Sequence, residues 1–210
     1  MPTSSAIKDN QQWLLSFYRS SELNGALFFG RVARTVRGPL QVDLTHHFSD
    51  EASHAAYWSR CMADMDLPTV RMGRSYQDNY LDMVGLPSSL MEVMAITHVF
   101  EKRAIHIYRR HLRQPSTEAA ITTTIDRIME DERWHVSYVR EALNVMAGQF
   151  GQQLVTDTVN RFAAADQEVY GQILTEFGER MDFLREVSPS AGERDEDSEQ
   201  GLSLHEAGNA

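Results

Sequence analysis

One five-residue pattern occurs twice in this chain and constrains its fold more than any other feature. The first copy runs from Asp50 to His54, the second from Asp131 to His135, and both read Asp-Glu-x-x-His. On an α-helix, residues three apart lie on the same face, so the Glu and His of each copy project side by side. A carboxylate and an imidazole at this spacing can bind one metal ion together. We therefore expect a helix at each copy and a metal site where the two helices meet.

The spacing of apolar residues predicts five helices. They cover about residues 10–36, 41–65, 88–113, 116–146 and 152–186. Gly38-Pro39 ends the first helix, and Ser89 with Glu92 three residues later forms a capping-box pattern at the start of the third. Ser116 or Thr117 is expected to cap the fourth helix.

The lengths of the connections predict how these helices are arranged. Short turns join the first helix to the second and the third to the fourth, so each pair should be an antiparallel hairpin. The link between the pairs, residues 67–87, is long enough to cross the bundle, and we expect at most one short helix in it. The predicted fold is all-α: a ferritin-like four-helix bundle of two hairpins and one crossover, plus a C-terminal helix.

Composition limits the class of protein. At 210 residues and 42% apolar, the chain is expected to form one domain over residues 10–186, followed by a disordered acidic tail at 187–210. No run of about 18 apolar residues predicts a membrane span, and the N-terminus does not read as a signal peptide, so a cytoplasmic protein is expected. A single cysteine, Cys61, excludes a disulfide framework and a Cys-rich metal site. The net charge of −10 argues against a nucleic-acid partner.

Two further glutamates are selected by their depth along the bundle. Glu132 lies 17 residues after the turn near residue 115 and Glu101 lies 14 before it, a mismatch of roughly 4–5 Å at 1.5 Å per residue. Glu92 lies 23 residues before the turn, which is too far along the bundle from the level of Glu132. Around the turn near residue 38, Glu22 lies 16 residues before and Glu51 13 after. The predicted metal ligands, which are also the predicted catalytic residues, are Glu22, Glu51, His54, Glu101, Glu132 and His135.

Four carboxylates and two imidazoles favour a pair of iron ions over zinc, with manganese or a mixed iron–manganese pair as the alternative. A ligating histidine usually donates its second ring N–H to a carboxylate. Asp50 and Asp131 are interpreted as these acceptors, reaching across the bundle.

Several nearby residues are interpreted as packing residues. His47 shares a helix face with Glu51, and we favour a polar core or surface position over a seventh ligand. The tyrosines that follow ligands at helical spacing could instead be hydrogen-bonding or radical groups: Tyr57, Tyr108 and Tyr138. Cys61 could line a cavity, but a buried free thiol is commoner. The basic residues near the end of the third helix are interpreted as a solvated face: Arg103, Arg109, Arg110 and His111.

Taken together, these residues resemble the ferritin-like di-iron carboxylate superfamily. The resemblance covers about residues 10–148 and is carried by the two Asp-Glu-x-x-His copies, by Glu22 in Ser-Glu-Leu-Asn-Gly and by Glu101 in Phe-Glu-Lys-Arg-Ala. It implies two bound irons, with Glu51 and Glu132 as bridging carboxylates and Glu22 and Glu101 as terminal ones. The spacing of Glu101 and Tyr108, followed by Glu-x-x-His, is also similar to that of aldehyde-deformylating oxygenases, although the rest of the chain is too different to assign that activity.

The function expected from the site is that of an O₂-activating non-haem di-iron oxidoreductase, an oxygenase or oxidase that acts on a small apolar substrate and takes electrons from an external donor. Gly25, Ala26 and Ala104 should leave room beside the metals, and Phe29 and Ile105 should make that room apolar. One alternative is a rubrerythrin- or ferritin-like peroxide reductase or ferroxidase. Another is a non-enzymatic helical module with a structural metal. No membrane partner is expected, and a homodimer is left open.

Overall fold

The computed structural model describes residues 4–178 and 180–181, and every regular element in them is helical. The elements are α1 (Ser4–Ala33), α2 (Leu40–Asp64), α3 (Tyr76–Val84), α4 (Leu90–Leu112), α5 (Ala119–Phe150) and α6 (Gln152–Glu176). The all-α prediction is confirmed, and α3 is the short helix allowed for in the long connection. The predicted tail at 187–210 lies outside the described residues.

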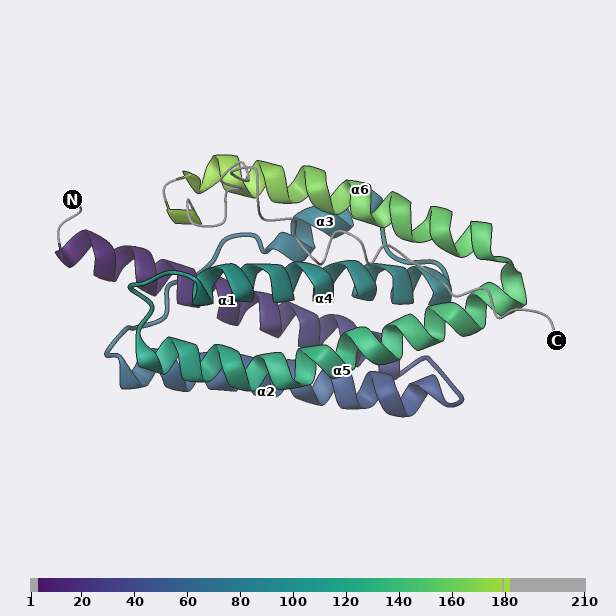
Figure 1. Ribbon diagram of the computed structural model, residues 1–210, viewed down its shortest axis with the longest axis horizontal. Coiled ribbons are helices and arrows are strands. Elements are labelled where there is room, and N and C mark those ends of the chain that lie inside the picture. The colour runs from purple at the N-terminus through teal and green to yellow at the C-terminus, as the bar shows by residue number, and fades with distance from the viewer. Residues whose placement is uncertain (1–3, 179, 182–210) are drawn as a thin grey trace.

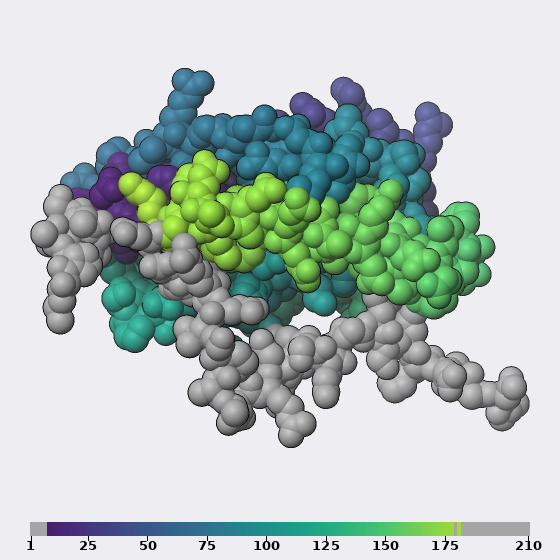
Figure 2. Space-filling model, turned by 90° about the horizontal axis from the view of Figure 1, so that it is seen from above, coloured from purple at the N-terminus to yellow at the C-terminus, as the bar shows by residue number. Residues whose placement is uncertain are grey.

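The long helices pack side by side along the molecule (Figure 1). α1 packs along α2, and α4 packs along α5. α2 also packs against α5, and this contact joins the two pairs. α6 covers α4 and α5 and runs along the face seen in Figure 2, while α3 lies between α6 and α1. No Cα of α1 comes within 8 Å of a Cα of α4, so these two helices are held apart.

The helix bounds differ from the prediction at both ends of the chain, since α1 begins at Ser4 instead of near residue 10 and α6 ends at Glu176 instead of 186. Two helix caps differ as well. At α4, the Ser89 side chain accepts a hydrogen bond from the Glu92 backbone N–H, but the Glu92 carboxylate binds Ser88 instead of closing the capping box on Ser89. At α5 the predicted cap is wrong. The Thr117 hydroxyl donates to the carbonyl of His111 at 2.8 Å, which closes α4, and Glu118 precedes α5 without a side-chain cap.

A partly buried ion pair joins α6 to α4. Arg103 of α4 donates two hydrogen bonds to the Asp166 carboxylate of α6, and the Tyr76 hydroxyl of α3 donates to the same carboxylate. The Arg103 guanidinium also lies 3.8 Å from the centre of the Tyr170 ring. The Asp166 carboxylate therefore joins α3, α4 and α6, and the assignment of Arg103 to a solvated face is wrong. His111 was assigned to the same face and is buried.

None of the described helices combines the length and the apolar character that crossing a bilayer requires.

Candidate metal centre

All six predicted ligands converge in the middle of the bundle. α1 supplies Glu22, α2 supplies Glu51 and His54, α4 supplies Glu101, and α5 supplies Glu132 and His135. Each of them is at most 6% exposed. The convergence follows from the depth matching, because residues at one level on neighbouring helices meet at one point of the core.

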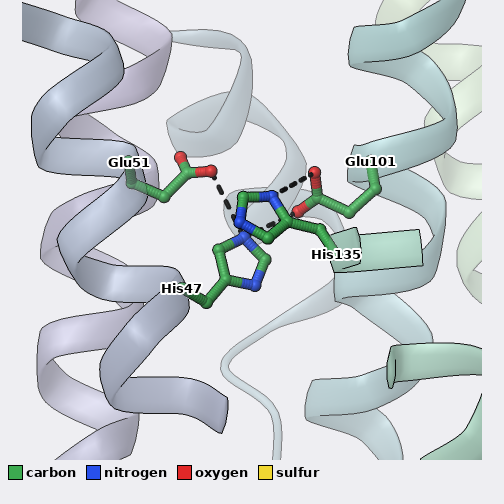
Figure 3. Close-up of side chains that lie close together, drawn as sticks. All are labelled: His47, Glu51, Glu101 and His135. Atoms are coloured by element: carbon green, nitrogen blue, oxygen red, sulfur yellow. Dashed lines mark hydrogen bonds and ion pairs between the residues drawn. The ribbon is translucent and has the colours of Figure 1, made fainter. Parts of the chain in front are cut away.

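The convergent side chains form two groups whose donor atoms lie within 4.8 Å of one another. We call the first group position A: His47, Glu51, Glu101 and His135 (Figure 3). The second is position B: Glu22, Glu51, His54 and Glu132. His47 belongs to position A and is fully buried, so it has the polar core position that the sequence favoured, but its ring lies directly among the predicted ligands.

Two carboxylates stand between the positions. Glu51 belongs to both groups. Glu132 places Oε2 3.3 Å from Nδ1 of His135 and Oε1 3.6 Å from Nδ1 of His54, so its two oxygens face different positions. Glu22 and Glu101 each serve one position. This arrangement is compatible with the division into bridging and terminal carboxylates that the sequence resemblance implies.

The distances between donor atoms fit shared cations. Two atoms bound to one ion at about 2.1 Å, roughly 90–110° apart, are separated by roughly 3.0–3.4 Å. The imidazole-to-carboxylate separations within the two groups run from 3.1 to 3.6 Å. In addition, Nδ1 of His54 is buried without a hydrogen-bond partner, although it faces Glu22 and Glu132. A metal ion would satisfy this buried nitrogen.

The two Asp-Glu-x-x-His copies orient each other's histidines. Nε2 of His54 on α2 lies 3.1 Å from Asp131 on α5, and Nε2 of His135 on α5 lies 3.2 Å from Asp50 on α2. When each Nε2–H donates to its Asp, each Nδ1 keeps a lone pair aimed at the glutamates. The predicted pairing across the bundle is therefore present in both directions.

Two tyrosines form hydrogen bonds with side chains of the two positions. The Tyr108 hydroxyl donates to Glu22, and it accepts in turn from the Trp58 indole N–H at 3.2 Å. The Tyr138 hydroxyl lies 2.7 Å from Nδ1 of His47. Both therefore have the hydrogen-bonding role that was only the alternative in the sequence analysis.

Tyr57 and Cys61 do not line the cavity beside the predicted ligands, although the Tyr57 ring centre lies 6.2 Å from that of His54. The guanidinium of Arg127 covers the Tyr57 ring at 3.8 Å from its centre. Cys61 is buried against Met65 and does not line the cavity beside the ligands, as expected for a packing thiol.

The pKa shifts of the side chains in positions A and B favour bound cations. Burial, followed by repulsion from neighbouring carboxylates, holds the pKa of Glu51 well above its usual value and raises that of Glu132 to about 7. Burial opposes the charged form of His54, but contact with Glu22 and the charge of Glu132 outweigh it and raise the pKa of His54 to about 9. Burial and the neighbouring His135 hold the pKa of His47 well below its usual value. Two bound cations would offset the repulsion that raises the glutamate pKa values.

Gly25 on α1 makes room for the bridging carboxylate. A Cβ added at this position would lie 1.9 Å from Oε2 of Glu51, far inside any real contact. The backbone of α1 thus approaches the Glu51 carboxylate so closely that any side chain at residue 25 would displace it.

A cavity of about 70 Å³ lies against the carboxylate side of the site, where α1 and α4 are held apart. All four ligand glutamates line it, and none of the three imidazoles does. Its apolar walls include Phe17, Phe29, Phe100, Ala104 and Ile107. Ala26 and Ile105 were also expected here, but the structure does not place them in the lining.

The cavity adjoins a larger groove of about 520 Å³ between α1, α3 and the start of α4. Four residues line both spaces: Gly25, Phe29, Gln77 and Phe100. Gln77 donates to the Ser21 carbonyl, and its own side-chain oxygen is buried without a hydrogen-bond partner. The junction is therefore mainly apolar, with one hydrogen-bond acceptor at its edge.

Comparison of the chain with protein-family models, with curated proteins and with solved structures gave no match. The chemistry of the site is therefore derived from its own residues.

Proposed function

We propose that this protein is a ferritin-like di-iron carboxylate oxidoreductase that activates O₂ to oxidise a small, apolar organic substrate. One observation carries the proposal: four glutamates and their histidines, drawn from four helices, form one buried group that opens onto an apolar cavity. The connection of two hairpins through the segment that contains α3 supports the ferritin-like topology.

The six predicted residues would hold two metal ions, with Glu51 and Glu132 shared between them. Iron suits this mixture of carboxylate and imidazole donors, and manganese at one or both positions is the alternative. Bound iron supplies the electrons and the open coordination positions that O₂ reduction requires. The chain's own residues keep the donors in place through the Asp50 and Asp131 hydrogen bonds.

The cavity favours catalysis over a purely structural metal. Structural sites are closed by protein ligands, whereas catalytic sites keep a position open. Here about 70 Å³ of space lies against the carboxylates, several times the roughly 10–15 Å³ that one water needs. The apolar walls would exclude bulk water, and the Tyr108 hydroxyl holds a proton beside Glu22 at the cavity wall. We place the organic substrate in the adjoining groove, with its reactive end at the junction near Gly25 and Phe100.

The small inner cavity also favours a second candidate. A space of about 70 Å³ admits O₂ or hydrogen peroxide, whereas the larger groove is needed for any organic substrate. If the groove serves no substrate, the protein would be a peroxide reductase or ferroxidase. Either activity takes electrons from an external donor or from ferrous ions.

The first test is metal content. Metal-free protein is loaded with ferrous ion without oxygen, and its iron is measured by elemental analysis. Glu132→Ala is compared with Glu130→Ala, which alters an exposed carboxylate on the same helix. We expect two irons per chain in the wild type and in Glu130→Ala, and a loss of iron in Glu132→Ala.

The second test is the fate of O₂ when the loaded protein is reduced and exposed to it. Oxidation of an added apolar substrate in step with O₂ uptake would support the oxygenase or oxidase. Consumption of peroxide or ferrous ion alone would favour the second candidate. Wild-type protein that takes up no iron would refute the di-iron proposal.

A further inference from the structure

We propose that His47 is a seventh metal ligand that makes the two positions unequal, so that position A selects iron over manganese while position B accepts either ion. The proposal rests on the metal site described above and goes beyond the six ligands of the proposed function. It concerns a residue that the sequence pattern does not mark.

The first support is the place of the His47 ring. Its Nε2 lies 3.2 Å from Oε1 of Glu51 and 3.1 Å from Oε1 of Glu101. Both separations match two donors that share one ion. The residue is completely buried, and Figure 3 shows its ring pointing into the space between the two carboxylates.

The second support is the way the ring is held. His47 is stacked between Phe29, at 3.7 Å between ring centres, and His135, at 3.6 Å. Its Nδ1 lies 2.7 Å from the Tyr138 hydroxyl. When Nδ1–H donates to Tyr138, Nε2 carries the lone pair that faces Glu51 and Glu101. A histidine whose second nitrogen is bound in this way resembles the two predicted ligands, with a tyrosine in place of an aspartate.

The consequence is an asymmetry between the positions. Position A has two imidazoles, His47 and His135, whereas position B has only His54. Imidazole suits iron, carboxylate oxygen suits manganese, and Fe²⁺ binds most nitrogen-containing sites more tightly than Mn²⁺. The second imidazole should therefore increase the preference for iron at position A alone.

The competing account is that His47 only donates a hydrogen bond to the carboxylates through Nε2–H. A hydrogen-bond donor would hold Glu51 and Glu101 in place without binding the ion. Removing it could weaken binding at position A, to which Glu101 belongs, but would leave the ratio of bound iron to bound manganese unchanged, because the ion would lose no nitrogen ligand.

The experiment is a competition between two ions. Metal-free protein is equilibrated without oxygen with equal, limiting concentrations of Fe²⁺ and Mn²⁺, and the bound ions are counted by elemental analysis after gel filtration. Separate titrations with each ion give the two dissociation constants. The variants are His47→Gln and Tyr138→Phe, and His98→Gln is the control because this half-buried imidazole belongs to neither metal position.

For the wild type and His98→Gln we expect two distinct dissociation constants, with iron in excess over manganese. His47→Gln should weaken the tighter position for Fe²⁺ by at least tenfold and bring the iron-to-manganese ratio closer to one. Tyr138→Phe keeps the ring of residue 138 and should weaken the same position by roughly 10–100-fold, the usual cost of losing a partner of a ligating histidine. Far-UV circular dichroism checks that each variant is folded.

Two results would overturn the inference. If folded His47→Gln and Tyr138→Phe both bind Fe²⁺ and Mn²⁺ with wild-type constants, His47 is not a ligand, although the di-iron site stands. If the wild type binds no pair of ions at all, both the inference and the proposed function fail.

Discussion

Replacement of Gly25 by alanine tests the metal site without removing any ligand. The new Cβ would lie 1.9 Å from Oε2 of Glu51, and an ordinary contact begins near 3.4 Å, so this oxygen must move by about 1.5 Å. Glu51 belongs to both metal positions, so this displacement affects both. The same substitution favours the metal-free helix, because alanine in a helix interior is about 0.8–1.0 kcal/mol more favourable than glycine.

The two effects have opposite signs and can be separated by thermal unfolding. Without metal, Gly25→Ala should raise Tm by about 2–4 °C, the shift expected from about 1 kcal/mol in a chain of this size. With metal at 100 times the wild-type Kd, binding stabilises the wild type by about 2.7 kcal/mol. If displacement of a ligand weakens binding about 100-fold, the same concentration stabilises the variant by only about 0.4 kcal/mol.

Gly171→Ala is the matched control. This glycine lies in α6, and a Cβ there would meet nothing within 4 Å. It should gain the same helix stability and keep full metal binding. Gly25→Ala protein that holds two ions with wild-type affinity would refute the view that the approach of α1 positions Glu51.

Three further predictions concern other parts of the bundle. Asp166→Ala should destabilise the protein by about 1.5–3 kcal/mol in urea unfolding, because the partly buried Arg103 guanidinium loses its charged hydrogen-bond acceptor. Tyr108→Phe should weaken ferrous binding at position B by roughly 10–100-fold, measured by titration, because Glu22 loses its donor. Burial lowers the pKa of His111 from 6.5 to about 4, so the unfolded chain binds the proton first and stability falls as pH drops from about 6.5 towards 4. At pH 5 the free energy of unfolding should be lower by about 2 kcal/mol for this reason, and His111→Gln should remove that part of the pH dependence in metal-free protein.

Each of these predictions has a contrary result. If the free energy of unfolding of Asp166→Ala falls by less than about 1 kcal/mol, the ion pair contributes little to stability beyond the packing of the two helices. Unchanged ferrous binding in Tyr108→Phe would exclude a role for the hydroxyl at Glu22. Equal pH profiles for the wild type and His111→Gln would show that the histidine does not remain neutral in the fold.

The sequence alone was sufficient to bring the six predicted ligands together and to find the aspartates that contact the two histidines. These predictions need only the regular rise of a helix and the position of two turns, because the level of a residue along a bundle follows from counting. The faces of Glu51, His54, Glu132 and His135 follow from the spacing of three within each motif. The all-α class follows from the same periodicity.

Contacts between helices that depend on rotation and separation were not visible in the sequence. His47 lies four residues before Glu51 and so shares its face, but only the stacking on Phe29 and His135 turns its ring into position A. The hydrogen bonds of Tyr108 and Tyr138 cross to other helices and depend on how those helices face one another.

The cavity and the ion pair between Arg103 and Asp166 were decided only by the tertiary structure. The cavity lies where α1 and α4 stand apart, and no local pattern encodes the distance between these two helices. Arg103 and Asp166 are 63 residues apart in the chain, and each looks like an ordinary surface charge until the two helices are packed together. Helical periodicity thus determined which residues share a level and a face, whereas the packing of whole helices determined which of those faces meet and where space remains between them.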